Sequence, residues 1–398
     1  MRILQIANKF PYPTKDGGSI ATLSLARSMA SLGHEVTVLA INTSKHFTDP
    51  RSVPPELAAS VRFIGVPVNT DINIFALARN FLFSSLPYNA ERFISRDFDR
   101  KLGELLSAES FDIIQLEGLY LAPYIGTIRS RSDAKIVMRA HNIEHEIWHR
   151  AAAMEKGLKK QYLRILAKRI RKMELHYLNL YNAVLPITSR DEGFLKKMGC
   201  TIPSHVVPMG INAGELLPDH QHLEFPSVFH IGALDWMPNQ EGLLWFFDHV
   251  WGKILEKKPD LKFYLAGRNA PDEFRSLPYP NIIFLGEVEN AYDFIRSKAV
   301  MIVPVLSGSG MRIKIIEGMA LEKAIVTTSI GTEGIGTTHG SDILISDDPE
   351  KFAQCVGRLL DDRNFYLEIG KKARNFVTTR YDNGSISKSL TDFYRNLN

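Results

Sequence analysis

The stretch VMIVPVLSGSGMRIKIIEGMALEKAIVTTS, residues 300–329, decides the fold. It begins with a β-rich apolar run at 300–305, which is followed by a turn of small residues at 307–310. A helical pattern then extends over 311–322, and a second β-rich run follows at 324–328. This order predicts a parallel α/β unit whose loop lies at the carboxyl edge of the sheet, where open α/β sheets bind ligands.

The loop and the helix after it suit an anionic ligand. Glycine lets the backbone approach a ligand closely, and the first turn of a helix offers unpaired N–H groups and a partial positive charge. Glu317 is placed to accept hydrogen bonds from two neighbouring hydroxyls, as on a ribose. The alternative is a plain surface ion pair between Lys314 and Glu317, worth at most roughly 0.5 kcal/mol. The predicted contacts of a nucleoside diphosphate here are Ser309, Gly310, Met311, Arg312, Lys314 and Glu317.

Strand-like runs alternate with helical patterns along the whole chain, in two series. The first series comprises 1–7, 35–41, 61–65, 111–117, 135–140 and 183–188. The second comprises 227–232, 261–267, 281–286, 300–305, 324–328 and 342–346. Alternation of this kind predicts parallel sheets. At 398 residues the chain is longer than a domain with a single hydrophobic core usually is. We therefore expect two domains, joined near VVPMGIN at 206–212.

The segment GSG-x-R-x-K-x-x-E at 308–317 resembles the donor-binding segment of a subgroup of the retaining group 1 glycosyltransferases, glycosyltransferase family 4. The resemblance covers nearly the whole chain. It implies the α/β fold called GT-B, two Rossmann-like domains with parallel sheets facing a central cleft. The expected domains are 1–207 on the acceptor side and 208–378 for the nucleotide-sugar, with a final helix, 379–398, packing back on the first domain.

The same resemblance implies an activity and further site residues. The activity is transfer of a sugar from a nucleotide-diphosphate donor to a glycan, lipid-linked or other acceptor, with retention at the anomeric carbon. His141, directly after the strand at 135–140, is the expected catalytic contact to the transferred sugar. Gly17 and Gly18 are expected to line the cleft near the donor phosphates, although a plain helix start explains them equally well.

The chain departs from the common family pattern at two places. Ser309 stands where many members have the first of two glutamates, and the loop at 232–242 has no basic residue. Because a buried diphosphate needs compensating charge, Arg312 and Lys314 are the predicted cations. Arg268, which follows the second strand of this domain, is a further candidate.

Two alternatives to transfer remain open at this stage. A nonhydrolysing nucleotide-sugar epimerase shares the fold. A zinc-dependent hydrolase is the reading of a different class, because His141, Glu144 and His145 match the H-x-x-E-H signature. That chemistry needs both imidazoles on one helical face. His141 is instead expected at the end of a strand, so neither a metal nor another cofactor is predicted.

Composition and charge limit which partners and which cellular compartment fit this protein. A net charge of +4 without a basic tail does not favour nucleic acid as a partner. Two cysteines, Cys200 and Cys355, predict no disulfide framework, and with no signal-peptide pattern they indicate a cytoplasmic protein.

Two segments bear on membrane contact. Residues 72–86 are unusually apolar, which we interpret as core packing, with a lipid-facing or acceptor-facing surface as the alternative. Residues 156–172 carry eight Lys or Arg and no acid, with apolar residues at helical spacing. Such a helix is most often a solvated face. The alternative is peripheral contact with an anionic membrane.

Overall fold

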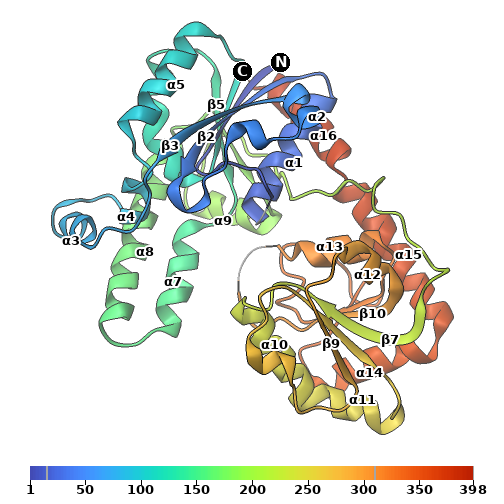
Figure 1. The fold of residues 1–398 in the computed structure, drawn as a ribbon. Coiled ribbons are helices and arrows are strands. Elements are labelled where there is room, and N and C mark those ends of the chain that lie inside the picture. Colours follow the sequence, from blue (N-terminus) through green and yellow to red (C-terminus); the bar gives the residue numbers. More distant parts are fainter. Residues whose placement is uncertain (15–16, 309–310, 398) are drawn as a thin grey trace. The chain divides into compact units, whose positions relative to one another are not determined.

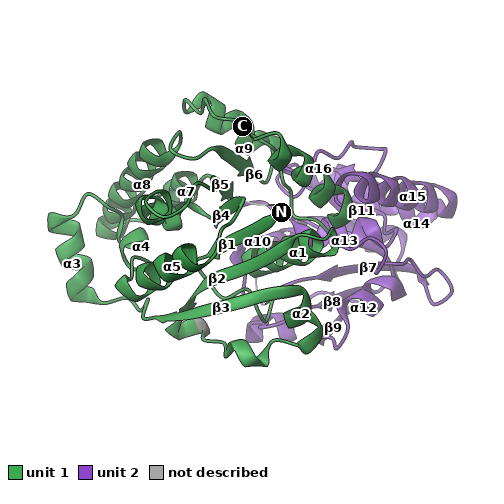
Figure 2. Ribbon diagram, turned by 90° about the horizontal axis from the view of Figure 1, so that it is seen from above, with its two compact units in different colours: residues 1–210, 383–398 green, residues 211–382 purple. Residues whose placement is uncertain are grey.

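The computed structural model describes residues 1–14, 17–308 and 311–397 (Figure 1). The chain divides into two compact units, shown in Figure 2. Unit 1 comprises residues 1–210 and 383–398, and unit 2 comprises residues 211–382. Each unit contains a six-stranded sheet, so the predicted α/β fold with two parallel sheets is confirmed. The domain boundaries predicted from the sequence, after 207 and after 378, stay predictions.

Unit 1 is built on a parallel sheet of strand order β3-β2-β1-β4-β5-β6. Its strands are β1 (Arg2–Ala7), β2 (Glu35–Thr43), β3 (Val61–Val68), β4 (Ile113–Glu117), β5 (Lys135–Ala140) and β6 (Ala183–Pro186). Its helices are α1 (Gly17–Ser31), α2 (Pro55–Ser60), α3 (Ile74–Phe83), α4 (Tyr88–Glu91), α5 (Arg96–Ala108), α6 (Ile125–Arg129), α7 (Glu144–Met154), α8 (Gly157–Tyr177), α9 (Ser189–Lys197) and α16 (Asn383–Arg395). Short 3₁₀ helices lie at Ser44–His46, Pro50–Ser52 and Leu119–Tyr124.

Unit 2 is built on a second parallel sheet, of strand order β12-β11-β10-β7-β8-β9. Its strands are β7 (Glu224–Ile231), β8 (Phe263–Ala266), β9 (Ile282–Gly286), β10 (Lys298–Val303), β11 (Ile325–Thr327) and β12 (Leu344–Ile345). Its helices are α10 (Met237–Phe246), α11 (Gly252–Lys257), α12 (Ala291–Ser297), α13 (Ile313–Ala320), α14 (Pro349–Asp361) and α15 (Arg363–Arg380). A π-helical segment, Phe247–Trp251, joins α10 to α11, and a 3₁₀ helix lies at Asp272–Arg275.

Both sheets are covered by apolar side chains on their two faces. In β1 the five residues from Ile3 to Ala7 are all buried, and β10 is buried from Ala299 to Val303. Strands buried on both faces appear in sequence as nearly continuous apolar runs. This is why the sequence pattern located the central strands; the edge strands β3 and β9 are less buried.

The last helix, α16, belongs to unit 1 and packs on α1. Leu390 and Tyr394 are buried there, and Ser28 Oγ donates to the Asn383 carbonyl at 2.9 Å. The chain leaves unit 1 after Gly210 and returns at Asn383. The Ile211 N–H donates to the Tyr381 carbonyl at 2.8 Å, so the two ends of unit 2 lie side by side.

The structure corrects one interpretation. Residues 72–86 do not pack in the core as expected: α3 leaves Ile74, Phe75, Leu82 and Phe83 exposed. Between α14 and α15 the chain breaks at Asp362, whose side chain caps α15 by accepting from Phe365 N at 2.9 Å. Cys200 and Cys355 are free thiols in different units, as the sequence suggested.

Candidate functional site

The predicted anion-binding segment lies after β10, at the carboxyl edge of the second sheet. Arg312 occupies the N-cap position of α13 and is buried, with Nη2 3.5 Å from the Gly308 carbonyl oxygen. Met311, just before it, packs against the apolar core of unit 2. Ser309 and Gly310, which the sequence also assigns to this site, lie outside the described residues.

Lys314 is held in place by two neutral acceptors from other elements. Its Nζ donates to Asn239 Oδ1 of α10 at 3.0 Å and lies 3.3 Å from His230 Nε2 of β7. A Cβ added to Gly232 would come within 2.3 Å of this Nζ, so the glycine makes room for the ammonium group. Burial lowers the pKa of Lys314 to about 7. The amine is therefore held in a fixed position in the first turn of α13, and it is fully protonated only below about pH 7.

The histidine partner of Lys314 has a defined tautomer. His230 is completely buried, and its Nδ1 donates to the Ile302 carbonyl of β10 at 2.9 Å. Nε2 is then the unprotonated nitrogen that accepts from Lys314. Burial and the Lys314 charge lower the pKa of His230 well below its usual value, so the ring stays neutral.

The backbones around Lys314 approach each other closely. A Cβ on Gly242 would lie 2.0 Å from the Pro304 carbonyl oxygen, and a Cβ on Gly267 would lie 2.0 Å from that of Gly232. Substitution at either glycine would force the loops apart. The carboxyl ends of β7, β8 and β10 are therefore fixed around the first turn of α13.

Glu317 lies one turn beyond Lys314 on α13. Within the described part of the chain, one hydrogen bond reaches its carboxylate, from Tyr292 Oη of α12 at 2.9 Å. Burial raises the pKa of Glu317, while the Tyr292 bond and Lys314 act in the opposite direction. The tyrosine fixes Oε1 and leaves Oε2 for another donor.

Arg268 follows β8 and is exposed. Its carbonyl accepts from Leu234 N at 2.9 Å, which ties the loop after β8 to the loop after β7. Arg268 is thus at the predicted edge of the sheet, but it is less enclosed than Arg312 or Lys314.

In unit 1, His141 directly follows β5 as predicted. Its Nε2 is 2.7 Å from Glu117 Oε2, at the end of the adjacent strand β4. Glu117 is buried and also accepts from Thr22 Oγ1 of α1 at 3.3 Å. Because the Glu117 carboxylate accepts this hydrogen bond, Nε2 of His141 carries the proton. In the neutral ring, Nδ1 is then the nitrogen without a proton. The orientation of His141 is set by a carboxylate that the sequence analysis did not single out.

Glu117 is the centre of a buried polar network. Burial raises its pKa, but Arg139, 3.7 Å away, and the bond to His141 outweigh this, so the pKa falls below its usual value. Arg139 is itself buried and donates to the Ala21 carbonyl at 3.0 Å. Gln115 donates to Glu117 and accepts from Tyr394 of α16. Glu117 is therefore an ionised carboxylate inside the unit.

Gly17 and Gly18 form the exposed start of α1. A Cβ on Gly17 would meet Met209 at an ordinary contact distance of 3.7 Å. Gly17 has no backbone conformation that demands glycine, so neither its backbone nor its surroundings require a glycine there.

The H-x-x-E-H residues do not form a common metal-binding face. His141 precedes α7, whereas Glu144 and His145 are in its first turn. His145 Nδ1 is bonded to Glu174 of α8, not to the carboxylate that holds His141. Burial raises the pKa of Glu144 to about 7. In the described residues, no group of three or more His, Cys, Asp or Glu could hold a metal ion, and the zinc hydrolase reading is not favoured.

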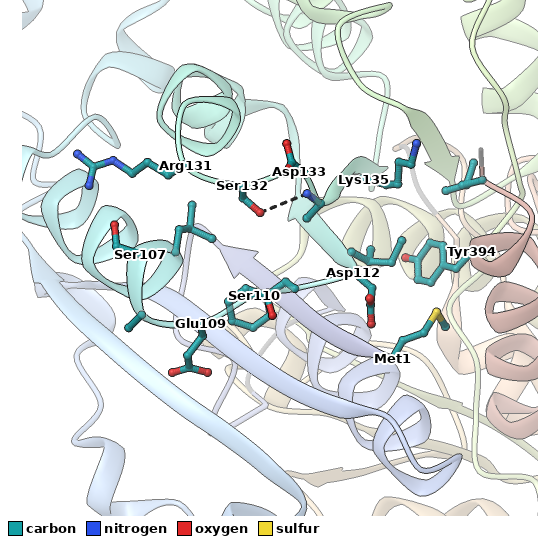
Figure 3. Close-up of a pocket in the computed structure, with 16 residues that line it drawn as sticks. Met1, Ser107, Glu109, Ser110, Asp112, Arg131, Ser132, Asp133, Lys135 and Tyr394 are labelled. Carbon is teal, nitrogen blue, oxygen red and sulfur yellow. Dashed lines mark hydrogen bonds between the residues drawn. The ribbon is translucent and has the colours of Figure 1, made fainter.

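A polar pocket lies elsewhere in unit 1, as Figure 3 shows. Met1, Asp112 and Lys135 line it, from the amino ends of β1, β4 and β5. His141 and Glu117 lie at the opposite, carboxyl ends. This pocket is therefore separate from the candidate site. Among the described residues, no helix is long and apolar enough to cross a membrane.

Several site residues were missed by sequence reasoning: Glu117, His230, Asn239 and Tyr292. Glu117 and His230 are polar residues at or near the carboxyl ends of apolar strands, which is the signal that could have identified them. Asn239 and Tyr292 lie in helices, and their sequence surroundings carry no such signal.

The fold and these sheet-edge residues define the GT-B class, and solved structures of similar fold support this. A sucrose-phosphate synthase from Thermosynechococcus elongatus superposes with a TM-score of 0.72 at 16% identity, covering 100% of this chain and 99% of that one. The Anabaena protein HepE, solved in complex with UDP, gives 0.70 at 11% identity, covering 99% and 100%.

The family follows from the sequence models that match. "Glycosyltransferase Family 4" matches residues 15–215, and "Glycosyl transferases group 1" matches residues 225–362. The chain belongs to these group 1, family 4 glycosyltransferases. A relative from Klebsiella pneumoniae, described as an uncharacterized 44.6 kDa protein in the cps region, is 24% identical over 406 aligned positions, covering 98% of both chains. The epimerase alternative is not favoured by these matches.

Proposed function

We propose that this glycosyltransferase moves a sugar from a nucleotide-diphosphate donor to a glycan, lipid-linked or other acceptor, with retention at the anomeric carbon. The observation that carries the proposal is the cluster of Lys314, His230 and Asn239 beside Glu317. Because neutral groups hold the Nζ of Lys314, an anionic ligand would stabilise its protonated form. The similar HepE structures, solved with UDP and with UDP-glucose, support a donor of this class.

Each candidate residue has a chemical role in the proposal. Arg312 and Lys314 compensate the diphosphate, and a guanidinium can bind two phosphate oxygens at once. Glu317 accepts from the ribose hydroxyls through Oε2. His141, the catalytic candidate, contacts the transferred sugar in an orientation fixed by Glu117. Gly17, Gly18, Met311 and Arg268 are proposed as further donor contacts.

The proposed setting is polysaccharide biosynthesis in the cytoplasm, without a metal. The Klebsiella relative described as a protein in the cps region supports the first part. Arg312 and Lys314 supply the charge that a metal would otherwise bring to the diphosphate, so activity should survive exhaustive chelation with EDTA. We also propose that residues 156–172, most of which belong to α8, contact an anionic membrane peripherally.

Titration calorimetry tests the donor site directly. Binding is compared for UDP, GDP, ADP and dTDP, and then for the preferred nucleoside diphosphate and its bare nucleoside. Arg312→Lys and Lys314→Ala should weaken binding of the diphosphate and barely change binding of the nucleoside. Glu317→Ala should weaken both at least about tenfold, because a hydrogen bond to a charged group is worth roughly 1.5–3 kcal/mol.

Arg275→Lys is the matched control, since Arg275 is an exposed arginine of the same unit, ion-paired with Asp272 at 3.4 Å. Equal losses for nucleoside and diphosphate in the Arg312 and Lys314 variants would contradict the phosphate roles. Retention is checked separately by NMR of the product from a donor of known anomeric configuration. Inversion would reject that part of the proposal.

A further inference from the structure

Helix α3 turns its apolar side chains away from the protein. Ile74, Phe75, Leu82 and Phe83 are 75%, 88%, 70% and 84% exposed, and Ile72, just before the helix, is 68% exposed. Soluble helices bury such residues and expose polar ones. Figures 1 and 2 both show α3 at the periphery of unit 1, beside α8. The apolar face of α3 is therefore exposed to solvent, the reverse of the usual arrangement in a soluble helix.

The opposite face of α3 is anchored, so the exposure is not the result of a loose helix. Asn80 is buried, and Arg169 of α8 donates to the carbonyls of Asn80 at 3.2 Å and Phe81 at 2.7 Å. The Phe81 ring lies 6.1 Å from that of Tyr162, also on α8. Asn73 caps the helix by accepting from Ala76 N at 3.1 Å. The apolar face is thus presented in a fixed orientation.

The neighbouring helix supplies positive charge. Between residues 156 and 172 the chain has eight Lys or Arg and no acid. Arg169 is committed to α3, while the exposed cations of this helix are Lys159, Arg164, Lys168, Arg171 and Lys172. An apolar helix face next to a basic one is the combination that binds an anionic lipid surface.

We propose that α3 is the lipid-inserting element of a peripheral membrane site, and that the cations of α8 bind anionic headgroups around it. This extends the proposed contact of residues 156–172 and does not depend on glycosyl transfer. A second protein is a poorer match. A protein partner would need an apolar groove for α3 and an acidic surface for α8 side by side. An anionic bilayer presents both at its headgroup boundary.

Vesicle flotation of the full chain tests the inference. The vesicles contain phosphatidylcholine with 30% phosphatidylglycerol, or phosphatidylcholine alone. Phe75→Ser/Phe83→Ser should lower the partition coefficient on the anionic vesicles about tenfold or more. Lys168→Gln/Arg171→Gln/Lys172→Gln should lower it about fivefold for each charge removed. The matched control is Phe47→Ser/Leu217→Ser, which removes two side chains 60% and 59% exposed elsewhere and should not change it.

A second experiment measures the insertion of α3 into the bilayer separately from the binding of charged headgroups. A fluorophore sensitive to its environment is placed at Phe83→Cys in a Cys200→Ser/Cys355→Ser background and should shift to the blue, with quenching by nitroxide lipids. All α3 variants should keep the UDP affinity of the parent chain, which separates failure of this inference from failure of the proposed donor site. Full vesicle binding by the Phe75/Phe83 variant, or no binding by the parent chain at low salt, would overturn it. So would a dimer in solution that the same variant dissociates.

Discussion

At the scale of single residues, Lys314 has an unusual environment within the proposed donor site. Its two partners, His230 and Asn239, carry no negative charge. Burial and the charge of Arg312 disfavour the protonated form of Lys314 more than Glu317 favours it. The pKa of Lys314 is therefore lowered to about 7. A bound diphosphate would supply the missing negative charge and raise that pKa again.

This coupling predicts a pH dependence of donor binding. Below pH 7, Lys314 is already protonated and ready for the diphosphate. Above pH 7 the free protein loses that proton, so binding must take it up, and affinity should fall by up to about tenfold per pH unit between 7 and 9. Calorimetry in buffers of different ionisation enthalpy measures the uptake. Lys314→Met should bind weakly, with no proton uptake from this position and a flat profile above pH 7.

Glu117 is predicted to position His141. In Glu117→Gln the acceptor oxygen remains but the charge is lost, so His141 and Arg139 both lose their buried counter-ion. We expect kcat to fall about tenfold or more, from the loss of a charged hydrogen bond worth roughly 1.5–3 kcal/mol. Affinity for the preferred nucleoside diphosphate, which we propose binds in unit 2, should not change. Thr22→Val removes another Glu117 contact without touching His141 and should retain kcat. An unchanged kcat in folded Glu117→Gln protein would refute the role.

At the scale of elements, Glu174 ties α8 to the start of α7. Its carboxylate accepts from Glu144 N at 2.8 Å and His145 N at 3.3 Å, and it bonds His145 Nδ1. Glu174→Gln should lower the free energy of unfolding by about 1.5–3 kcal/mol, measured by urea denaturation. Glu155→Gln is the control, because its partner Lys159 is exposed and such a pair contributes only about 0.5 kcal/mol. Equal losses would mean that Glu174 acts as an ordinary surface charge.

Helices and strands could be predicted from the sequence more completely than the contacts between side chains. The twelve strands of the described residues all overlap predicted runs, and the central ones do so because buried parallel strands are apolar stretches bounded by turns. Helix α3 was misjudged, since apolar content does not say which way a helix faces. The contact of His230 with Lys314 could not be predicted, because it depends on how β7 lies against α13, far apart in sequence. Glu117 was missed because it matches no motif, although its position at the end of an apolar run marks the edge of the sheet.

At the scale of the whole molecule, each hydrophobic core cluster is made of residues from one unit, which predicts two separable unfolding events. Leu390, in α16, is completely buried in unit 1, and Leu359, in α14, is completely buried in unit 2. Leu390→Ala should destabilise unit 1 alone, although α16 follows unit 2 in sequence, and Leu359→Ala should destabilise unit 2 alone. Each should cost about 2–5 kcal/mol in its own unit.

Hydrogen exchange followed by mass spectrometry assigns each loss to its peptides. In Leu390→Ala the strands β1 to β6 should exchange faster, and β7 to β12 should keep their rates; Leu359→Ala should give the reverse. Faster exchange throughout both units in either variant would show that the whole chain unfolds as one cooperative body.

The return of α16 to unit 1 has a consequence for the order in which the newly made chain can fold. Residues 383–398 are synthesised after residues 211–382, so the face of α1 that Leu390 and Tyr394 cover stays bare while residues 211–382 leave the ribosome. Unit 2 is continuous in sequence and can complete its core during this time. The unit whose synthesis starts first is therefore the one that finishes folding last.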